Sequence, residues 1–165
     1  MENTSIIEKP FVEKMLAAAR CSYERDGALV PVLFMKFAGE KSTLMPLDLP
    51  QTPEARYRYF QALGHSFRKS GKVLTEALLI MEGWYVAVDA QSDLLARPSA
   101  HPKRRSAVIV IGRNAAKTAH TSVVQVAPDT TQLPLVWPAP ALAAYGSAGP
   151  VNPTPVGLLD ALFSA

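Results

Sequence analysis

The chain has 165 residues, of which 48% are hydrophobic and 19% charged, and its formal net charge is +3. These values are ordinary for one soluble globular domain with an apolar core. No run reaches the roughly 20 apolar residues of a membrane span, and the first residues form no apolar leader. We therefore expect a cytoplasmic protein without a membrane partner. Its one cysteine, Cys21, excludes an internal disulfide and any cysteine-based zinc cluster.

Basic residues are concentrated in the middle of the chain. Residues 54–117 hold eleven Lys and Arg against five Asp and Glu, and no Lys or Arg follows residue 128. Such an excess attracts polyanions if the charges share one face of the fold. Spacing along the chain does not decide whether they do.

The N-terminal third predicts a helix followed by two strands. Residues 10–24 repeat apolar side chains at helical spacing, and Gly27 is suited to a left-handed cap. Residues 28–37 are apolar at both alternating positions, as in a strand covered on both faces. Pro31 within this run favours an edge position or a bulge. A turn at 38–41 then leads to a shorter strand.

A second helix and three strands follow. Thr52, Pro53 and Glu54 are typical of a helix start, and this helix is expected to end near Gly71. The most apolar run, residues 73–88, predicts a central strand, with a helical start near 74–79 as the alternative. Two further strands are predicted, over residues 106–113 and 120–128.

This order, α-β-β-α-β-β-β, predicts an α+β fold: a mostly antiparallel sheet of about five strands with two helices on one face. A parallel α/β fold would need a helix after nearly every strand. We assign residues 1–127 to a single α+β domain. Residues 128–165 are expected to form an extended, Pro-rich apolar arm ending in a short amphipathic helix. Packed on the domain or on a partner subunit, this arm would support a homo-oligomer.

Motifs for common chemistry are missing from the sequence. It contains no glycine-rich nucleotide-binding motif, and its three histidines are isolated from one another. We therefore expect no cofactor and no metal. Glu82 is the main catalytic candidate, because a carboxylate inside an apolar strand is costly unless it is paired. It could act as an acid/base or form a structural ion pair with Arg104 or Arg105.

A basic loop, RPSAHPKRRSAVIVIG at residues 97–112, runs directly into an apolar segment. Ser99, Lys103, Arg104 and Arg105 are its candidates for anion binding. The competing interpretation is a solvated, charged loop that leads into a buried strand. Both interpretations make the second half of this segment a core strand.

The motif E-G-W at 82–84, followed by P-S-x-x-P-x-x-R at 98–105 and an apolar strand, resembles a group of small prokaryotic α+β proteins. The resemblance begins at a G-x-L-x-P element at Gly27 and extends to about residue 112. That group has no assigned activity, so the resemblance implies a related fold and no mechanism. The resemblance implies that Trp84 lies with the candidate structural pair of Glu82 and Arg105. It also singles out Ser99.

Two functions remain open at this point. The first is a non-catalytic binding or assembly module that docks an anionic ligand or nucleic acid on a basic face. The second is a small enzyme with Glu82 as acid/base and Arg104 or Arg105 as anion clamp. The enzyme needs these groups to converge with a third polar group, whereas the binding module needs only a contiguous exposed basic face.

Overall fold

The structure, a computed structural model, describes residues 5–85, 105–126, 131–132 and 155–164. Its class is α+β with an antiparallel sheet, as predicted. The helices and strands follow in the order α1 (Lys9–Asp26), β1 (Val32–Phe37), β2 (Thr43–Pro46), α2 (Pro53–Lys69), β3 (Leu74–Tyr85), β4 (Arg105–Asn114), β5 (His120–Val126), β6 (Thr131–Gln132) and α3 (Pro155–Ser164).

One sheet contains all the described strands, in the spatial order β2-β1-β3-β4-β5-β6. It has six strands rather than about five, because the two-residue β6 pairs with the end of β5. β3 lies inside the sheet, where it pairs with β1 on one side and with β4 on the other. The alternative of a helical start at residues 74–79 is therefore wrong.

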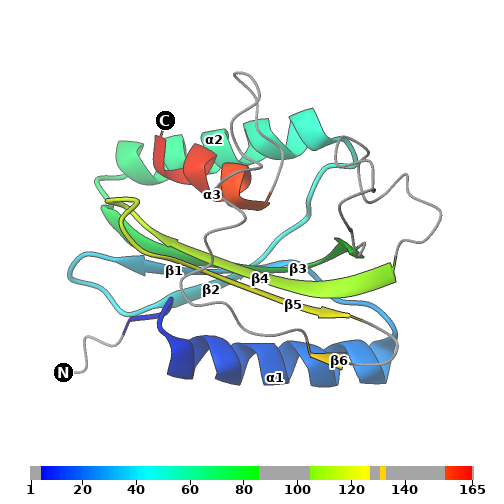
Figure 1. Cartoon of the computed structure of the whole chain (residues 1–165). Coiled ribbons are helices and arrows are strands. Elements are labelled where there is room, and N and C mark those ends of the chain that lie inside the picture. The colour runs from blue at the N-terminus through cyan, green and yellow to red at the C-terminus, as the bar shows by residue number, and fades with distance from the viewer. Residues whose placement is uncertain (1–4, 86–104, 127–130, 133–154, 165) are drawn as a thin grey trace, which may run out of the picture.

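The helices lie on opposite faces of the sheet, which corrects the prediction of two helices on one face (Figure 1). Alternate residues of a strand face opposite sides, so β3 contributes to two cores. Leu78 and Ile80 pack in the cluster that includes Val12 and Leu16 of α1. The cluster on the other face joins β3 to α2 and α3, and its members from β3 are Ala77, Leu79 and Met81. β3 is apolar at both alternating positions because helices cover both faces of the sheet.

The ends of α1 and α2 follow from local sequence. Gly27 adopts a left-handed φ of 70°, and its N–H donates to the carbonyl of Tyr23 at 2.8 Å. At the start of α2, the Thr52 hydroxyl accepts from the N–H of Ala55 at 3.2 Å. Pro31 lies one residue before β1, which is an interior strand, so the edge alternative was wrong. The register shift that β1 does contain lies between Lys36 and Phe37 and not at Pro31.

The C-terminal helix α3 packs beside α2 on the sheet. Leu158, Leu159 and Leu162 are buried in the same cluster as Phe60 of α2. Gly64 of α2 makes this close approach possible, since a Cβ at that position would lie 2.1 Å from the carbonyl oxygen of Leu162. Residues 133–154, which make up most of the predicted Pro-rich arm, lie outside the described residues.

Candidate functional site

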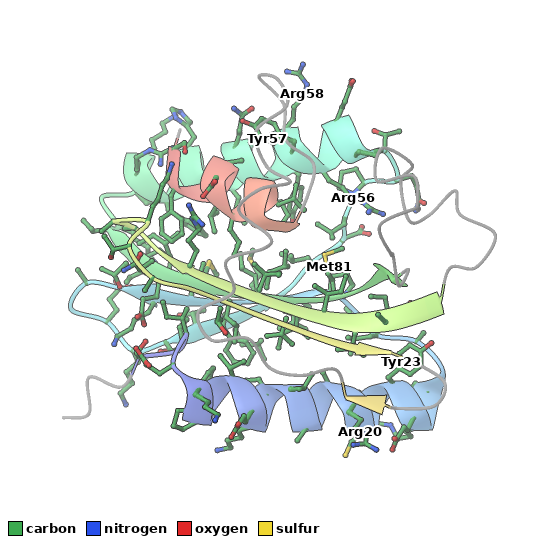
Figure 2. All side chains as sticks on the ribbon, viewed as in Figure 1. Arg20, Tyr23, Arg56, Tyr57, Arg58 and Met81 are labelled. Carbon is green, nitrogen blue, oxygen red and sulfur yellow. The ribbon has the colours of Figure 1, made fainter. Side chains whose placement is uncertain are left out.

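The outer side of α2 carries exposed cations. Arg58, Arg68 and Lys69 are all exposed, and none has an ion-pair partner among the described residues. We call these three residues the cationic face of α2. Figure 2 shows Arg58 pointing away from the sheet, whereas Arg56 lies on the side of α2 toward the sheet. Glu54 is the one acid of α2, and it lies in the first turn.

This arrangement follows from the amphipathic pattern of α2. Phe60 and Gly64 are buried against the sheet and α3, and that burial fixes which residues point outward. Lys69 lies eleven residues after Arg58, close to three helical turns, so both residues occupy one stripe. Three turns of helix separate the two residues by about 16 Å along the axis. Arg68 lies beside Lys69 at the same end of α2.

Charges on α1, the helix of the opposite layer, are largely paired with one another. Its ion pairs are Lys9–Glu13 at 3.9 Å, Arg20–Glu24 at 3.1 Å and Arg25–Asp26 at 2.9 Å. In the last pair, the hydrogen bond from Arg25 lowers the pKa of Asp26. The positive field of the helices is therefore concentrated on the α2 layer, because the charges of α1 neutralise each other.

Other cations near α2 already have partners. The Nε of Arg56 donates to the carbonyl of Pro50 at 2.7 Å. Lys72 lies 3.8 Å from Glu40 and 5.0 Å from the ring centroid of Phe37. These contacts hold the loops at the two ends of α2. They leave Arg58, Arg68 and Lys69 as the cations of this region that are available to a ligand.

A further ion pair joins the sheet to α3. The Nε of Arg113 lies 2.7 Å from Oδ1 of Asp160, and the two side chains are 13% and 32% exposed. Neither atom makes a well-directed hydrogen bond within the described residues, so charge holds the pair together. The guanidinium of Arg113 therefore has a structural role, which is to join β4 to α3.

Glu82 has a structural partner. Its carboxylate accepts a hydrogen bond from the backbone N–H of Leu29, two residues after the Gly27 cap of α1. In the sheet register Glu82 is paired with Val108, whereas Arg105 is paired with Tyr85. This three-residue offset favours opposite faces for Glu82 and Arg105. Their ion pair stays a prediction that the register does not support.

Glu76 makes an equivalent contact before α1. Its carboxylate accepts from the hydroxyl of Ser5 at 2.6 Å and from the N–H of Ile6 at 3.0 Å, and Lys36 lies 4.0 Å away. Glu76 and Glu82 are six residues apart on β3, so they share one face of the sheet. Together they attach the segments before and after α1 to the central strand.

The remaining candidates from the sequence are only partly described. Ser99, Lys103 and Arg104 lie outside the described residues, so their role in anion binding stays a prediction. Trp84 and Arg105 belong to the backbone of β3 and β4, but their side chains lie outside the described part. Trp84 pairs with Ser106 in the register.

Sequence reasoning placed Arg58, Arg68 and Lys69 in the basic middle of the chain without naming them as a site. The signal that identifies them is the contrast between the two helices. Three basic residues of α1 are ion-paired with acids of the same helix, as in Lys9–Glu13. In α2, Glu54 lies four residues before Arg58 without a described ion pair between them, and no acid of α2 lies within one turn of Arg68 or Lys69.

Within the described ranges, no three His, Cys, Asp or Glu side chains are grouped so that they could hold a metal ion. None of the helices described is both long and apolar enough to cross a membrane. Comparison of the chain with known protein families, with curated proteins and with solved structures gave no match. The resemblance to small prokaryotic α+β proteins therefore stays a prediction.

Proposed function

We propose that this protein is a non-catalytic binding module that docks an anionic partner on the cationic face of α2. The observation that carries the proposal is that Arg58, Arg68 and Lys69 are exposed and have no acidic partner among the described residues. Uncompensated cations on one face raise the local concentration of a polyanion and speed its association. A cytoplasmic location belongs to this proposal as an expectation.

The enzyme alternative has less support. An acid/base needs a carboxylate that can reach a substrate, and the Glu82 carboxylate is engaged by the N–H of Leu29. The clamp that this alternative assigns to Arg104 or Arg105 involves side chains outside the described part of the chain.

The apolar residues of α3 that could join two subunits are already buried within one chain. α3, the described end of that arm, buries Leu158, Leu159 and Leu162 against its own chain. A homo-oligomer would therefore depend on other parts of the arm. Sedimentation of the full chain tests this half of the proposal, because a purely monomeric protein at high concentration would exclude it.

Binding to soluble polyanions tests the main proposal. Heparin, poly-glutamate and a mixed-sequence DNA duplex are titrated with the full-length protein at several salt concentrations. We expect at least one of them to bind, with an affinity that falls as salt rises. The triple variant Arg58→Glu, Arg68→Glu, Lys69→Glu should weaken this binding at least tenfold. Lys14→Glu on α1 is the control for charge reversal of an exposed cation on the opposite layer.

Two results would overturn the proposal. One is that none of the three polyanions binds. The other is that the triple variant binds as tightly as the unchanged protein, since the cationic face of α2 would then make no contribution. Circular dichroism and thermal unfolding of each variant establish that the fold is retained.

A further inference from the structure

We infer that the cationic face of α2 binds the phosphate backbone of a nucleic acid duplex without reading its base sequence. This inference rests on the proposed function and names the partner class for the same surface. It follows from three features of α2: the absence of an apolar anchor on the exposed side, the spacing of the cations, and the inward orientation of the aromatic residues.

The exposed side of α2 lacks the groups that a protein partner would need. Large exposed hydrophobic residues in the described part of the chain are Val30, Leu44 and Val73, and none of them belongs to α2. The exposed residues of α2 are Glu54, Arg58, Ala62, His65, Ser66, Arg68 and Lys69. Protein interfaces depend on buried aromatic and apolar anchors. Phosphate contacts need only cations and polar donors, so this composition favours a polyelectrolyte.

The spacing of the cations disfavours a single small anion. Arg58 and Lys69 are eleven residues apart on a continuous helix, which is about 16 Å along the axis. A single phosphate group could contact both side chains only if they bent strongly toward each other along the helix. Each strand of DNA carries one phosphate per nucleotide, so a duplex presents several phosphates across a surface of this length. A repeating anion therefore fits the cationic face better than a point charge.

The aromatic residues of α2 are used in the core. Phe60 is fully buried, and Tyr57, Tyr59 and Phe67 are partly buried against the same cluster. Phe67 also meets Phe37 of β1 edge to face, with 5.0 Å between ring centroids. Proteins that hold single strands stack successive bases on exposed aromatic rings. Because every aromatic residue of α2 is buried or half-buried, we expect a duplex, whose bases are already stacked, to be preferred over a single strand.

Fluorescence anisotropy with labelled oligonucleotides tests this inference on the full-length protein. The probes are two mixed-sequence duplexes of equal length and different sequence, one single strand of the same length, and heparin as competitor. We expect both duplexes to bind with affinities within about threefold of each other, and the single strand to bind at least fivefold more weakly. A plot of log affinity against log salt should lose about one unit of slope for each cation removed.

The variants Arg58→Gln, Arg68→Gln and Lys69→Gln measure those slopes one cation at a time, with Lys14→Gln on α1 as the matched control. A control slope equal to that of the unchanged protein supports the inference. A duplex that does not bind, or a single strand that binds as tightly as the duplex, overturns it. If heparin or poly-glutamate binds through these residues while duplexes do not, the inference fails and the proposed function stands. If no polyanion binds, both fail.

Discussion

The Glu82 carboxylate on β3 accepts a hydrogen bond from the backbone N–H of Leu29, and this contact fixes the chain just after α1. Sequence reasoning treated Glu82 as a catalytic candidate, because a carboxylate within an apolar strand needs a partner. Its described partner is a backbone amide from another part of the same domain. The two hypotheses for this residue therefore predict different consequences of mutation.

Replacing Glu82 should affect stability. In Glu82→Ala the N–H of Leu29 loses its partner, and we expect a loss of about 1–3 kcal/mol in the free energy of unfolding. Glu82→Gln should lose less, because its amide oxygen can still accept. Urea denaturation monitored by circular dichroism measures both values. Glu13→Ala, at an exposed residue of α1, is the control. A loss in Glu82→Ala no larger than in this control would contradict the structural role.

Gly64 tests the docking of α3 on α2. At an exposed position of a helix, Gly→Ala stabilises a protein by about 0.5–1 kcal/mol. At Gly64 the new Cβ would lie 2.1 Å from the backbone oxygen of Leu162, so one helix must move. We expect Gly64→Ala to destabilise the protein by about 1–3 kcal/mol. Thermal unfolding measures the effect, and a rise in the melting temperature would show that α3 does not pack there.

The ion pair of Arg113 and Asp160 is expected to couple α3 to the sheet. Asp160→Asn leaves the mostly buried guanidinium of Arg113 without its counter-charge, and we expect it to cost about 1–3 kcal/mol. Asp160→Asn combined with Arg113→Met should cost less than the sum of the two single changes, because neither charge is then left unpaired. A double-mutant cycle from urea denaturation gives this coupling. Strict additivity would show that the pair contributes nothing.

Thr121 on β5 offers a stabilising change. Its side chain is fully buried, and its hydroxyl has no hydrogen-bond partner within the described residues. A buried hydroxyl without a partner carries an uncompensated desolvation cost. Thr121→Val keeps the shape and removes that group, so we expect a gain of about 1 kcal/mol in the free energy of unfolding. Differential scanning calorimetry measures the change. A lower melting temperature would indicate a polar partner for the hydroxyl.

Much of the local structure was predictable because its causes are local. The Thr52 hydroxyl, Pro53 and the glycine at 27 determine where helices begin and end through contacts within a few residues. The apolar run in β3 likewise identifies an interior strand. The edge position expected from Pro31 was wrong because β1 begins only at Val32, and where pairing begins depends on the neighbouring strands rather than on local composition.

The candidate site was less predictable, because it depends on which charges are already paired. Arg56, Lys72 and Arg113 are as basic in the sequence as Arg58, yet each has a partner in the fold. Those partners include Glu40 and Asp160, which lie 32 and 47 residues away along the chain. The spacing of residues along the sequence does not reveal contacts between such distant positions.

By itself, the sequence determined the α+β class, the position of the central strand and the caps of α1 and α2, since propensity and hydrophobic period act over neighbouring residues. Only the tertiary structure decided that α1 covers one face of the sheet while α2 and α3 cover the other. The physical reason is that β3 is apolar on both faces, and each face must be buried by some helix. It also decided that Glu82 meets Leu29, and that Arg58, Arg68 and Lys69 stay exposed, because long-range packing selects which charges find partners.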